Sequence, residues 1–168
     1  MNNELPTRKH PRLKEYDYSQ DGYYHIIICT LNKQPTLSKV VVGRGLAPAE
    51  IELSPVGVIV EEQLLKLSDR YPHVVIDKYI IMPTHIHAII TLNNAAGASP
   101  RPTVMDVVCA FKSISTRICN KHDNVQGRQI WQDSFYDEVI RTQEMYNNIW
   151  QYIDGNPAKW IEDDYYIE

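Results

Sequence analysis

Nine consecutive residues, Tyr23 to Leu31 (YYHIIICTL), place the strongest constraint on the fold. They combine aromatic and β-branched side chains in a tight run, a composition that is typical of β-strands. The run is almost continuously apolar, so neither face of this strand can lie against water. We therefore expect a central strand in a sheet that is covered on both faces.

Further along the chain, the apolar pattern changes between strand and helix periods. Ser54 before Pro55 predicts a helix start, because serine caps the first turn and proline is tolerated at its first position. Thr103 can cap a second helix, and Asn156-Pro157 predicts the end of the last one. The predicted elements are short strands at 40–42 and 51–53, a helix from 55 to about 70, strands at 74–82 and 87–92, a loop at 93–103, a helix from 103 to about 121, an extended segment at 135–140 and a helix from about 143 to 155.

The order of these elements indicates the fold class. Two strands in succession between helices argue against a doubly wound parallel sheet. They favour the α+β class, as a ferredoxin-like split βαβ sandwich with an antiparallel central sheet, helices on one face and an additional C-terminal helix. We expect one domain at residues 22–160, between an irregular basic arm at 1–21 and an acidic tail at 161–168.

The charge is unevenly distributed along the chain. The net charge of −4 counts against a simple nucleic-acid binder, which usually carries a basic surplus. A basic arm can nevertheless coexist with a local phosphate-binding face. The acidic tail is expected to be solvated. The basic side chains of the arm are Arg8, Lys9, Arg12 and Lys14.

Composition also narrows the cellular setting. No apolar run approaches the roughly 18 residues that a membrane span needs, and residues 1–14 lack the apolar stretch of a signal peptide. We expect a cytoplasmic protein. The three cysteines are odd in number and form no C-x-x-C pair, so we expect reduced thiols, with Cys29 and Cys109 in the core.

The triplet His85-Ile86-His87 lies at the edge of an apolar strand. Strand side chains alternate, so the two imidazoles share one face about 7 Å apart while Ile86 points into the core. Two such imidazoles can bind one divalent cation, with a third ligand from elsewhere and open positions for substrate. The spacing is also compatible with two surface histidines at a strand end, and taken alone it favours that interpretation.

Tyr152 and Asn156 are four residues apart on the last predicted helix, so they share one helical face. A tyrosine hydroxyl can attack phosphorus when its phenolate is favoured, and an asparagine oxygen can ligate a metal. Tyr152 is also compatible with simple packing in the apolar stripe of this helix. Periodicity cannot choose it over Tyr136 or Tyr146.

Three long segments together resemble the REP-associated tyrosine transposases, relatives of the single-strand insertion-sequence transposases in the HUH nuclease superfamily. They are RLKEYDYSQDGYYHIIICTLNKQ, IDKYIIMPTHIHAIITL and IWQDSFYDEVIRTQEMYNNIWQYIDGNPAKW. The resemblance extends from about Arg12 to Trp160. It implies that residues 22–160 are an HUH-type domain with the histidine pair on a central strand.

The resemblance also implies the chemistry. Tyr152 opens a Tyr-Ile-x-x-Asn-Pro pattern as the nucleophile, and His85, His87 and Asn156 are the implied ligands of Mg²⁺ or Mn²⁺. The implied reaction is a metal-dependent cleavage and rejoining of hairpin-bearing, REP-like single-stranded DNA through a 5′-phosphotyrosine. Two residues depart from the pattern: Thr84 precedes the first histidine where relatives commonly have Asn, Asp or Glu, and Gly155 precedes Asn156.

The family resemblance leaves the oligomeric state and two other functions open. Relatives act as monomers or as homodimers. One rival is a non-catalytic DNA-binding regulator derived from a transposase. The other is a zinc-dependent hydrolase that adds Asp77 or Cys29 to the histidines. The candidate DNA-binding residues are Arg8, Lys9, Arg12, Lys14, Lys112 and Arg117.

Overall fold

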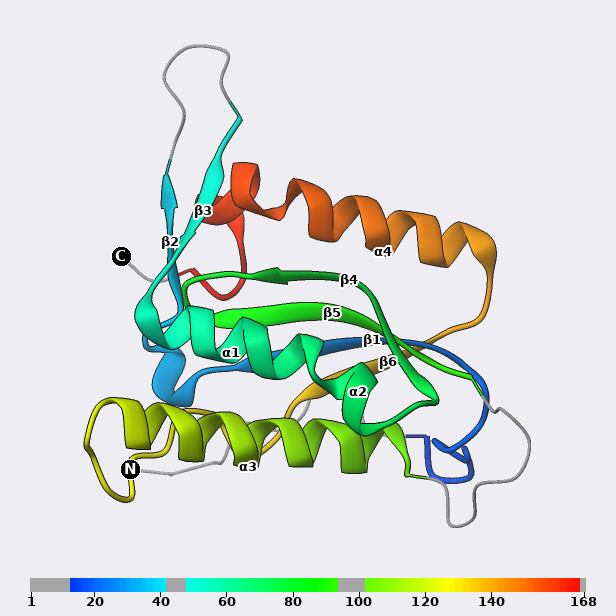
Figure 1. Ribbon diagram of the computed structural model, residues 1–168. Helices are drawn as coiled ribbons and strands as arrows, with labels where there is room; N and C mark the ends of the chain where they lie inside the picture. The colour runs from blue at the N-terminus through cyan, green and yellow to red at the C-terminus, as the bar shows by residue number, and fades with distance from the viewer. Residues whose placement is uncertain (1–12, 42–47, 94–101, 167–168) are drawn as a thin grey trace, which may run out of the picture.

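The computed structural model describes residues 13–41, 48–93 and 102–166, and its centre is a four-stranded antiparallel sheet (Figure 1). The strands lie in the order β4-β5-β1-β6, and every neighbouring pair is antiparallel. β5 lies between β1 and β4, which is the split βαβ arrangement. The predicted ferredoxin-like α+β sandwich is therefore confirmed. The strands are β1 (Gly22–Cys29), β4 (Val74–Ile81), β5 (His85–Leu92) and β6 (Tyr136–Ile140).

Helices cover both faces of this sheet. In Figure 1, α1 and α3 lie on one side, and α4, the expected additional helix, lies on the other. The helix predicted from 55 to about 70 is interrupted at Lys66, which caps α1 and precedes the short α2. The bounds are α1 (Pro55–Leu65), α2 (Leu67–Arg70), α3 (Val104–His122) and α4 (Gln143–Gly155), with 3-10 turns η1 (Leu31–Lys33) and η2 (Asn156–Glu162).

Local sequence explains where the long helices begin. The Ser54 hydroxyl accepts a hydrogen bond from the backbone N–H of Gly57, and Thr142 does the same for Met145. Thr103 and Asp106 form a reciprocal capping box at the start of α3. Each cap satisfies N–H groups that have no partner inside the helix.

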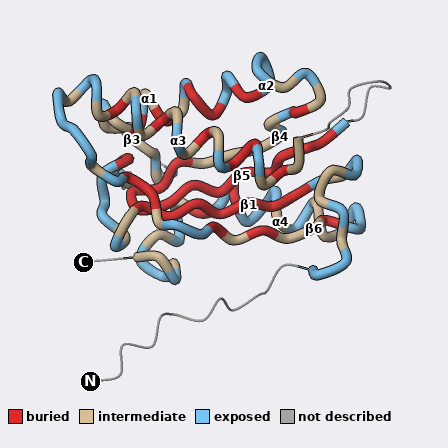
Figure 2. The backbone as a smooth tube through the Cα atoms, turned by 90° about the horizontal axis from the view of Figure 1, so that it is seen from below, coloured by how far each residue is buried: buried red, intermediate tan, exposed pale blue. Residues whose placement is uncertain are grey.

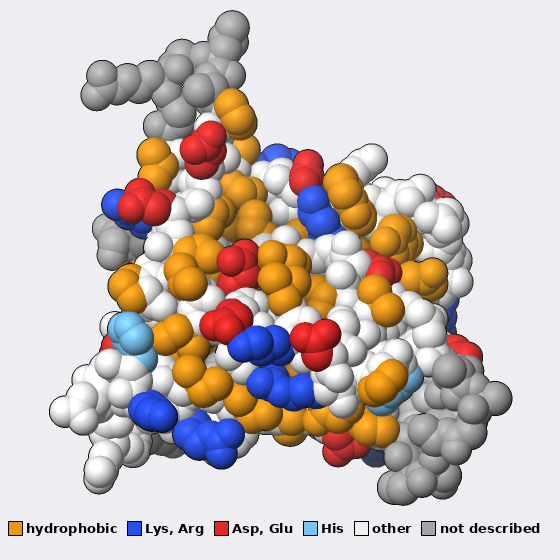
Figure 3. All heavy atoms as spheres, in the orientation of Figure 1, with side chains coloured by type: hydrophobic (Ala, Val, Ile, Leu, Met, Phe, Trp, Pro, Cys, Tyr) orange, Lys and Arg blue, Asp and Glu red, His pale blue; other side chains and the backbone are white. Residues whose placement is uncertain are grey.

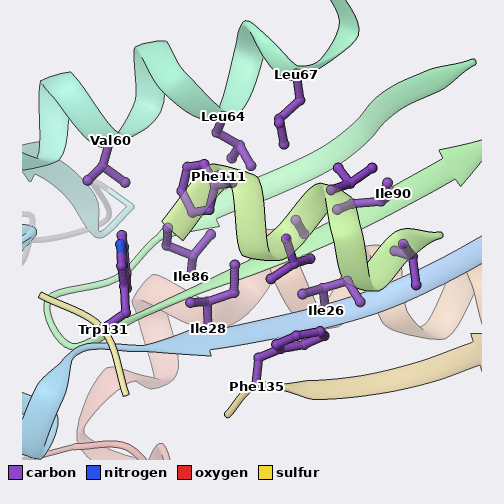
Figure 4. Close-up of a cluster of buried hydrophobic side chains, with 14 of the residues drawn as sticks. Ile26, Ile28, Val60, Leu64, Leu67, Ile86, Ile90, Phe111, Trp131 and Phe135 are labelled. Atoms are coloured by element: carbon purple, nitrogen blue, oxygen red, sulfur yellow. The ribbon is translucent and has the colours of Figure 1, made fainter. Parts of the chain in front are cut away.

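The main core lies between the sheet and the α1–α3 layer. Alternation along β5 sends Ile86, Ala88 and Ile90 into it, and Phe111 of α3 packs against them (Figure 4). The opposite face carries a smaller cluster in which Ile89 meets Ile153 of α4. Figure 2 shows the central strands β1 and β5 largely buried, whereas the edge strands β4 and β6 are buried only in part. The expectation of a strand covered on both faces is thus met by β1, and its neighbour β5 is buried along its whole length.

A second sheet of two strands, β2 (Ser38–Val41) and β3 (Glu50–Leu53), projects beside the main body (Figure 1). It corresponds to the two short predicted strands. The predicted loop at 93–103 lies largely outside the described residues, as does most of the basic arm. No helix in the described ranges is long and apolar enough to cross a membrane.

The cysteines differ from the prediction at one position. Cys29 and Cys119 are buried, but Cys109 is exposed. Cys109 lies in an apolar run of α3, on the side of the helix that faces away from the sheet. A continuous apolar stretch does not show which of its residues a helix turns outward.

Gly57 allows α1 to approach the chain at Leu37. A Cβ atom at position 57 would lie 1.9 Å from the Leu37 carbonyl oxygen, whereas a Cβ at Gly155 would meet nothing within 4 Å. We predict that Gly57→Ala destabilises the fold by at least about 1–3 kcal/mol through overpacking. Thermal unfolding checks this, with Gly155→Ala as the matched control, which is expected to be neutral or stabilising by up to about 1 kcal/mol. Equal unfolding midpoints for the two variants would contradict the claim that position 57 requires glycine because of the close approach to Leu37.

Candidate active site

His85 and His87 lie at the start of β5 on the face covered by α4. Both side chains are fully buried, so the interpretation of the pair as surface histidines is wrong. Their Nε2 atoms are 2.9 Å apart. At this separation the two atoms either share a hydrogen bond or ligate one ion, because two bare lone pairs would repel. Two ligands at right angles, each about 2.1 Å from one ion, would be roughly 3 Å apart.

The Nδ1 atoms have partners of their own. The Thr84 hydroxyl donates to the Tyr165 carbonyl at 3.0 Å, so it accepts from Nδ1 of His85 at 3.1 Å. That bond places the His85 proton on Nδ1 and leaves Nε2 as a lone-pair donor. Nδ1 of His87 lies 3.2 Å from Nε2 of His25. Thr84 thus fixes the orientation of His85, a candidate ligand. Although relatives commonly have Asn, Asp or Glu at this position, the threonine hydroxyl makes the orienting contact.

Burial keeps both imidazoles neutral. Together with a smaller contribution from the Lys33 charge, it lowers the pKa of His85 to about 3. It also lowers the pKa of His87 well below its ordinary value, with smaller contributions from His85 and His25. Neutral imidazole is the form that binds metals.

Asp163 adds a carboxylate beside the histidines. Its Oδ2 atom is 3.9 Å from Nε2 of His85, and its side chain is only 2% exposed. Among the described residues, His85, His87 and Asp163 form the one group of His, Cys, Asp or Glu side chains with the spacing of a metal site. The prediction that the acidic tail is solvated is therefore wrong at this residue.

Asn156 lies against this group at the end of α4. Its Nδ2 donates to Oδ2 of Asp163 at 3.1 Å, while its Oδ1 is buried without a hydrogen-bond partner. A buried carbonyl oxygen without a partner is costly. Two neutral imidazoles, a carboxylate and this oxygen fit a divalent cation, which accepts all of these atoms as ligands.

Tyr152 lies on α4 next to His87. The two ring centroids are 5.2 Å apart with an interplanar angle of 85°, and the tyrosine is about half exposed. Burial and the Asp163 charge raise the pKa of Tyr152, partly offset by a hydrogen bond with the Asn156 side chain. The hydroxyl is therefore a neutral phenol at pH 7. One chain contains both the histidine pair and this tyrosine.

The C-terminal segment, residues 157–166, covers the histidine pair. The Tyr165 ring lies 4.6 Å from the His85 ring, and the Trp160 ring lies 6.1 Å from it. Nζ of Lys33 donates to the Asp164 carbonyl at 2.9 Å and lies over the Tyr165 ring. These contacts contribute to the complete burial of the His85 imidazole.

The predicted DNA-binding residues have different surroundings. Arg8, Lys9 and Arg12 lie outside the described residues. Lys14 and Arg117 are exposed. Nζ of Lys112 donates to the backbone carbonyls of residues 132 and 133, so this ammonium ties a loop to α3.

The two additional ligands of the zinc-hydrolase rival are not in the metal group. Asp77 accepts a hydrogen bond from Thr91, further along β5 than the histidine pair. Cys29 lies opposite His85 in the β1–β5 register, but burial raises the pKa of its thiol to about 11. A buried thiol of this kind is a poor ligand at neutral pH because the thiolate is the binding form.

A model of the family described as IS200-like transposases matches residues 18–156. The chain belongs to the IS200-like transposase family. An uncharacterized protein of Haemophilus influenzae is 28% identical over 177 residues, which cover 96% of this chain and 94% of that protein. Membership in this family supports a role as a transposase that processes DNA. It also confirms the family resemblance seen in the sequence.

Two solved structures share the fold of this IS200-like transposase. One is a REP-associated tyrosine transposase bound to a REP hairpin, with 20% identity, a TM-score of 0.62, and coverage of 89% of this chain and 74% of that one. The other is a putative transposase from Deinococcus radiodurans R1, with 18% identity, a TM-score of 0.50, and coverage of 86% and 96%. At these identities the likeness concerns the fold.

Sequence reasoning missed three residues of the site. Asp163 was assigned to a solvated tail, although its position soon after the Asn-Pro that ends the last helix was a usable signal. Tyr165 was not considered for the same reason. His25 lies inside an apolar strand, where a buried polar side chain needs a partner, and that requirement was the available signal.

The low pKa of His85 has a consequence for stability in the metal-free protein. Because the folded-state pKa lies below the ordinary value of 6.5, stability is fully present above pH 6.5 and decreases as the pH falls toward about 3. Each pKa unit of difference corresponds to about 1.4 kcal/mol. We predict that urea unfolding of the metal-free protein shows several kcal/mol less stability at pH 4 than at pH 7.

Substitution separates this effect from general acid destabilisation. His85→Gln should reduce the slope of stability against pH between 6.5 and 4 and leave the part that the buried His87 contributes. His122→Gln at an exposed position should keep the parent slope. An unchanged slope in His85→Gln would show that His85 is not the group responsible.

Proposed function

We propose that this protein is a metal-dependent single-strand DNA endonuclease and transposase that cleaves and rejoins hairpin-bearing DNA through Tyr152. The observation that carries the proposal is the position of the Tyr152 ring, 5.2 Å from the His87 ring in the same chain. A nucleophile of the right type thus lies beside a candidate cation site. The hairpin substrate follows from the family resemblance, and it is supported by the REP hairpin bound to the structurally similar transposase.

His85, His87 and Asp163 would hold the divalent cation, with Oδ1 of Asn156 as a further ligand. Bound there, a cation such as Mg²⁺ or Mn²⁺ supplies a Lewis acid that offsets negative charge on phosphate oxygens. Asp163 is the addition that the structure makes to the ligand set implied by the sequence. The Asn156 amide also contacts Tyr152, so the same side chain helps to orient the nucleophile.

The reaction is a transesterification. The Tyr152 oxygen attacks the phosphorus in line, a bond from that oxygen to phosphorus forms, and the bond from phosphorus to the 3′ oxygen breaks. The phenol loses one proton and the 3′ oxygen gains one, so charge and atoms balance. The 5′-phosphotyrosine keeps the energy of the cleaved linkage, and a 3′-hydroxyl can reverse the step without a nucleotide cofactor.

The burial of the histidines favours a second candidate, the non-catalytic DNA-binding regulator. A phosphodiester cannot reach His85 or His87 while Trp160 and Tyr165 cover them. For catalysis, the C-terminal segment has to move away from the histidine pair. For a regulator it could stay in place while DNA binds elsewhere.

Cleavage assays with the Tyr152→Phe variant test the proposal. Incubated with hairpin-bearing single strands and Mn²⁺ or Mg²⁺, the parent should form a covalent protein–DNA adduct that denaturing gels resolve. Tyr152→Phe should form no adduct and lose cleavage by about 10³-fold or more. Tyr146→Phe, on the same helix and in contact with Tyr23, should retain the activity.

The contrary results are separable. Tight hairpin binding by the parent with no adduct under either metal would establish the regulator. An adduct that persists in Tyr152→Phe would show that another residue is the nucleophile.

The surface along α3 is a candidate for phosphate contacts. Figure 3 shows Lys and Arg side chains over the part of this face that α3 forms. A hollow of about 570 Å³ beside α3 is lined by polar and basic residues that include Arg117 and Lys121. Basic side chains on a concave surface can follow a nucleic-acid backbone.

Arg117→Ala tests this surface. Loss of one phosphate contact should weaken hairpin binding about equally for different sequences and reduce the slope of log Kd against log salt by about 1. Fluorescence anisotropy at salt concentrations from about 50 to about 200 mM, where counterion release changes the binding affinity, measures this slope. Lys66→Ala at the C-terminal cap of α1, where Lys66 pairs with Glu62, is the charge-matched control. Identical slopes for both variants would remove Arg117 from the interface.

A further inference from the structure

His25 is a third histidine on the face of the sheet that holds the candidate metal ligands. It lies on β1, where its register partners are Ile89 of β5 and Glu138 of β6. His87 pairs with Ile27, so His25 and His87 are diagonal neighbours on adjacent strands. His25 is 5% exposed, and its ring is nearly parallel to that of His87, at 15° with 5.4 Å between the centroids.

The contacts of His25 form a line from the candidate metal site toward the surface. Its Nε2 is 3.2 Å from Nδ1 of His87, and its Nδ1 is 4.0 Å from the Glu138 carboxylate. The Glu138 side chain is 41% exposed. The order from the inside outward is His87, His25, Glu138.

Only one arrangement of protons along this line suits a cation. A neutral imidazole carries one N–H, so His87 can offer its Nε2 lone pair to a cation only when its proton is on Nδ1. Nε2 of His25 must then accept that proton's hydrogen bond, which places the His25 proton on Nδ1. There it faces the Glu138 carboxylate, whose charge favours an N–H on this side.

The reverse arrangement blocks the site. If His25 donated through Nε2, His87 would carry its proton on Nε2 and donate it to Nε2 of His85, 2.9 Å away. Every ring would then be hydrogen-bonded, but the lone pair needed by a cation would be occupied. The carboxylate of Glu138 is the nearby charge that opposes this arrangement.

We propose that His25, assisted by Glu138, is a positioning residue that holds the His87 proton on Nδ1 and so presents Nε2 of His87 as a metal ligand. This inference rests on the proposed metal-dependent function and assigns a role to a residue outside the ligand set. His25 thus fixes the proton position of His87 in the same way that Thr84 fixes the proton position of His85. Partners of this kind, behind the ligands themselves, typically change metal affinity by about 10–100-fold when they are removed.

Mn²⁺ binding to the full-length protein tests the proposal without reference to activity. Electron paramagnetic resonance of free Mn²⁺ gives the affinity of the parent and of His25→Ala, His25→Gln and Glu138→Gln. We expect about 10–100-fold weaker binding in His25→Ala. His25→Gln should recover most of the loss, because an amide oxygen can accept from Nδ1 of His87. Glu138→Gln should weaken binding by a smaller factor, and His73→Ala serves as a control for the loss of a histidine.

A second readout separates positioning from packing. Nitrogen-15 NMR of the Mg²⁺-saturated parent should show the His87 proton on Nδ1. A folded His25→Ala variant that binds Mn²⁺ as tightly as the parent, or a His25→Gln variant no better than His25→Ala, would overturn the proposal. So would a parent His87 with its proton on Nε2 when Mg²⁺ is bound.

The outcome for His25 is distinguishable from the outcome for the proposed function. A parent that binds Mn²⁺ through His25-supported ligands but forms no DNA adduct would refute the nuclease and keep this role. A parent that binds no Mn²⁺ would refute both. If His25→Ala does not fold, the Mn²⁺ affinity of Glu138→Gln still tests the proposal, and an affinity equal to that of the parent would count against it.

Discussion

The antiparallel ladder between β1 and β5 is the interaction on which the rest of the structure depends. It runs without a register shift from Gly22↔Leu92 to Cys29↔His85. Because side chains alternate across a strand, this single register sends Ile26 and Ile86 into the main core and His25 and His87 to the opposite face. A slip of one residue would exchange the two sets, so the apolar core itself enforces the position of the candidate ligands.

Burial then determines the chemistry of that second face. Burial disfavours the charged imidazolium at His85 and His87, and each of their ring nitrogens needs a partner. Thr84 and His25 are the partners of the two Nδ1 atoms, and the Asp163 carboxylate lies 3.9 Å from Nε2 of His85. The remaining imbalance, the unpaired Oδ1 of Asn156 and the short approach of two Nε2 atoms, is what a bound cation would resolve.

Local sequence predicted most of the fold because local physics decides most of it. The Ser54 and Thr103 caps predict helix starts that the structure confirms, and the apolar run at Tyr23–Leu31 predicts a strand that is buried on both faces. The same period-two rule placed His85 and His87 on one face. The order of strands in the sheet followed from the order of elements and the preference for split βαβ units.

The features that the sequence does not predict depend on how distant parts of the chain come together in the fold. The acidic residues after α4 look like a solvated tail, and only the three-dimensional course of residues 157–166 brings Asp163 and Tyr165 onto His85. Lys112 is a similar case, since its exposed appearance in the sequence hides two bonds to a distant loop. The roles proposed for Tyr152 and Asn156 rest on the family resemblance, because periodicity alone gives no reason to prefer these residues.

The central claim is that the buried histidine pair is a divalent cation site. Anomalous X-ray diffraction from crystals soaked in Mn²⁺ tests it most directly. The account predicts one strong peak about 2–2.3 Å from Nε2 of both His85 and His87, with Asp163 or Asn156 completing the near shell. A map in which Mn²⁺ binds only elsewhere, while the two imidazoles stay hydrogen-bonded to each other, would contradict it.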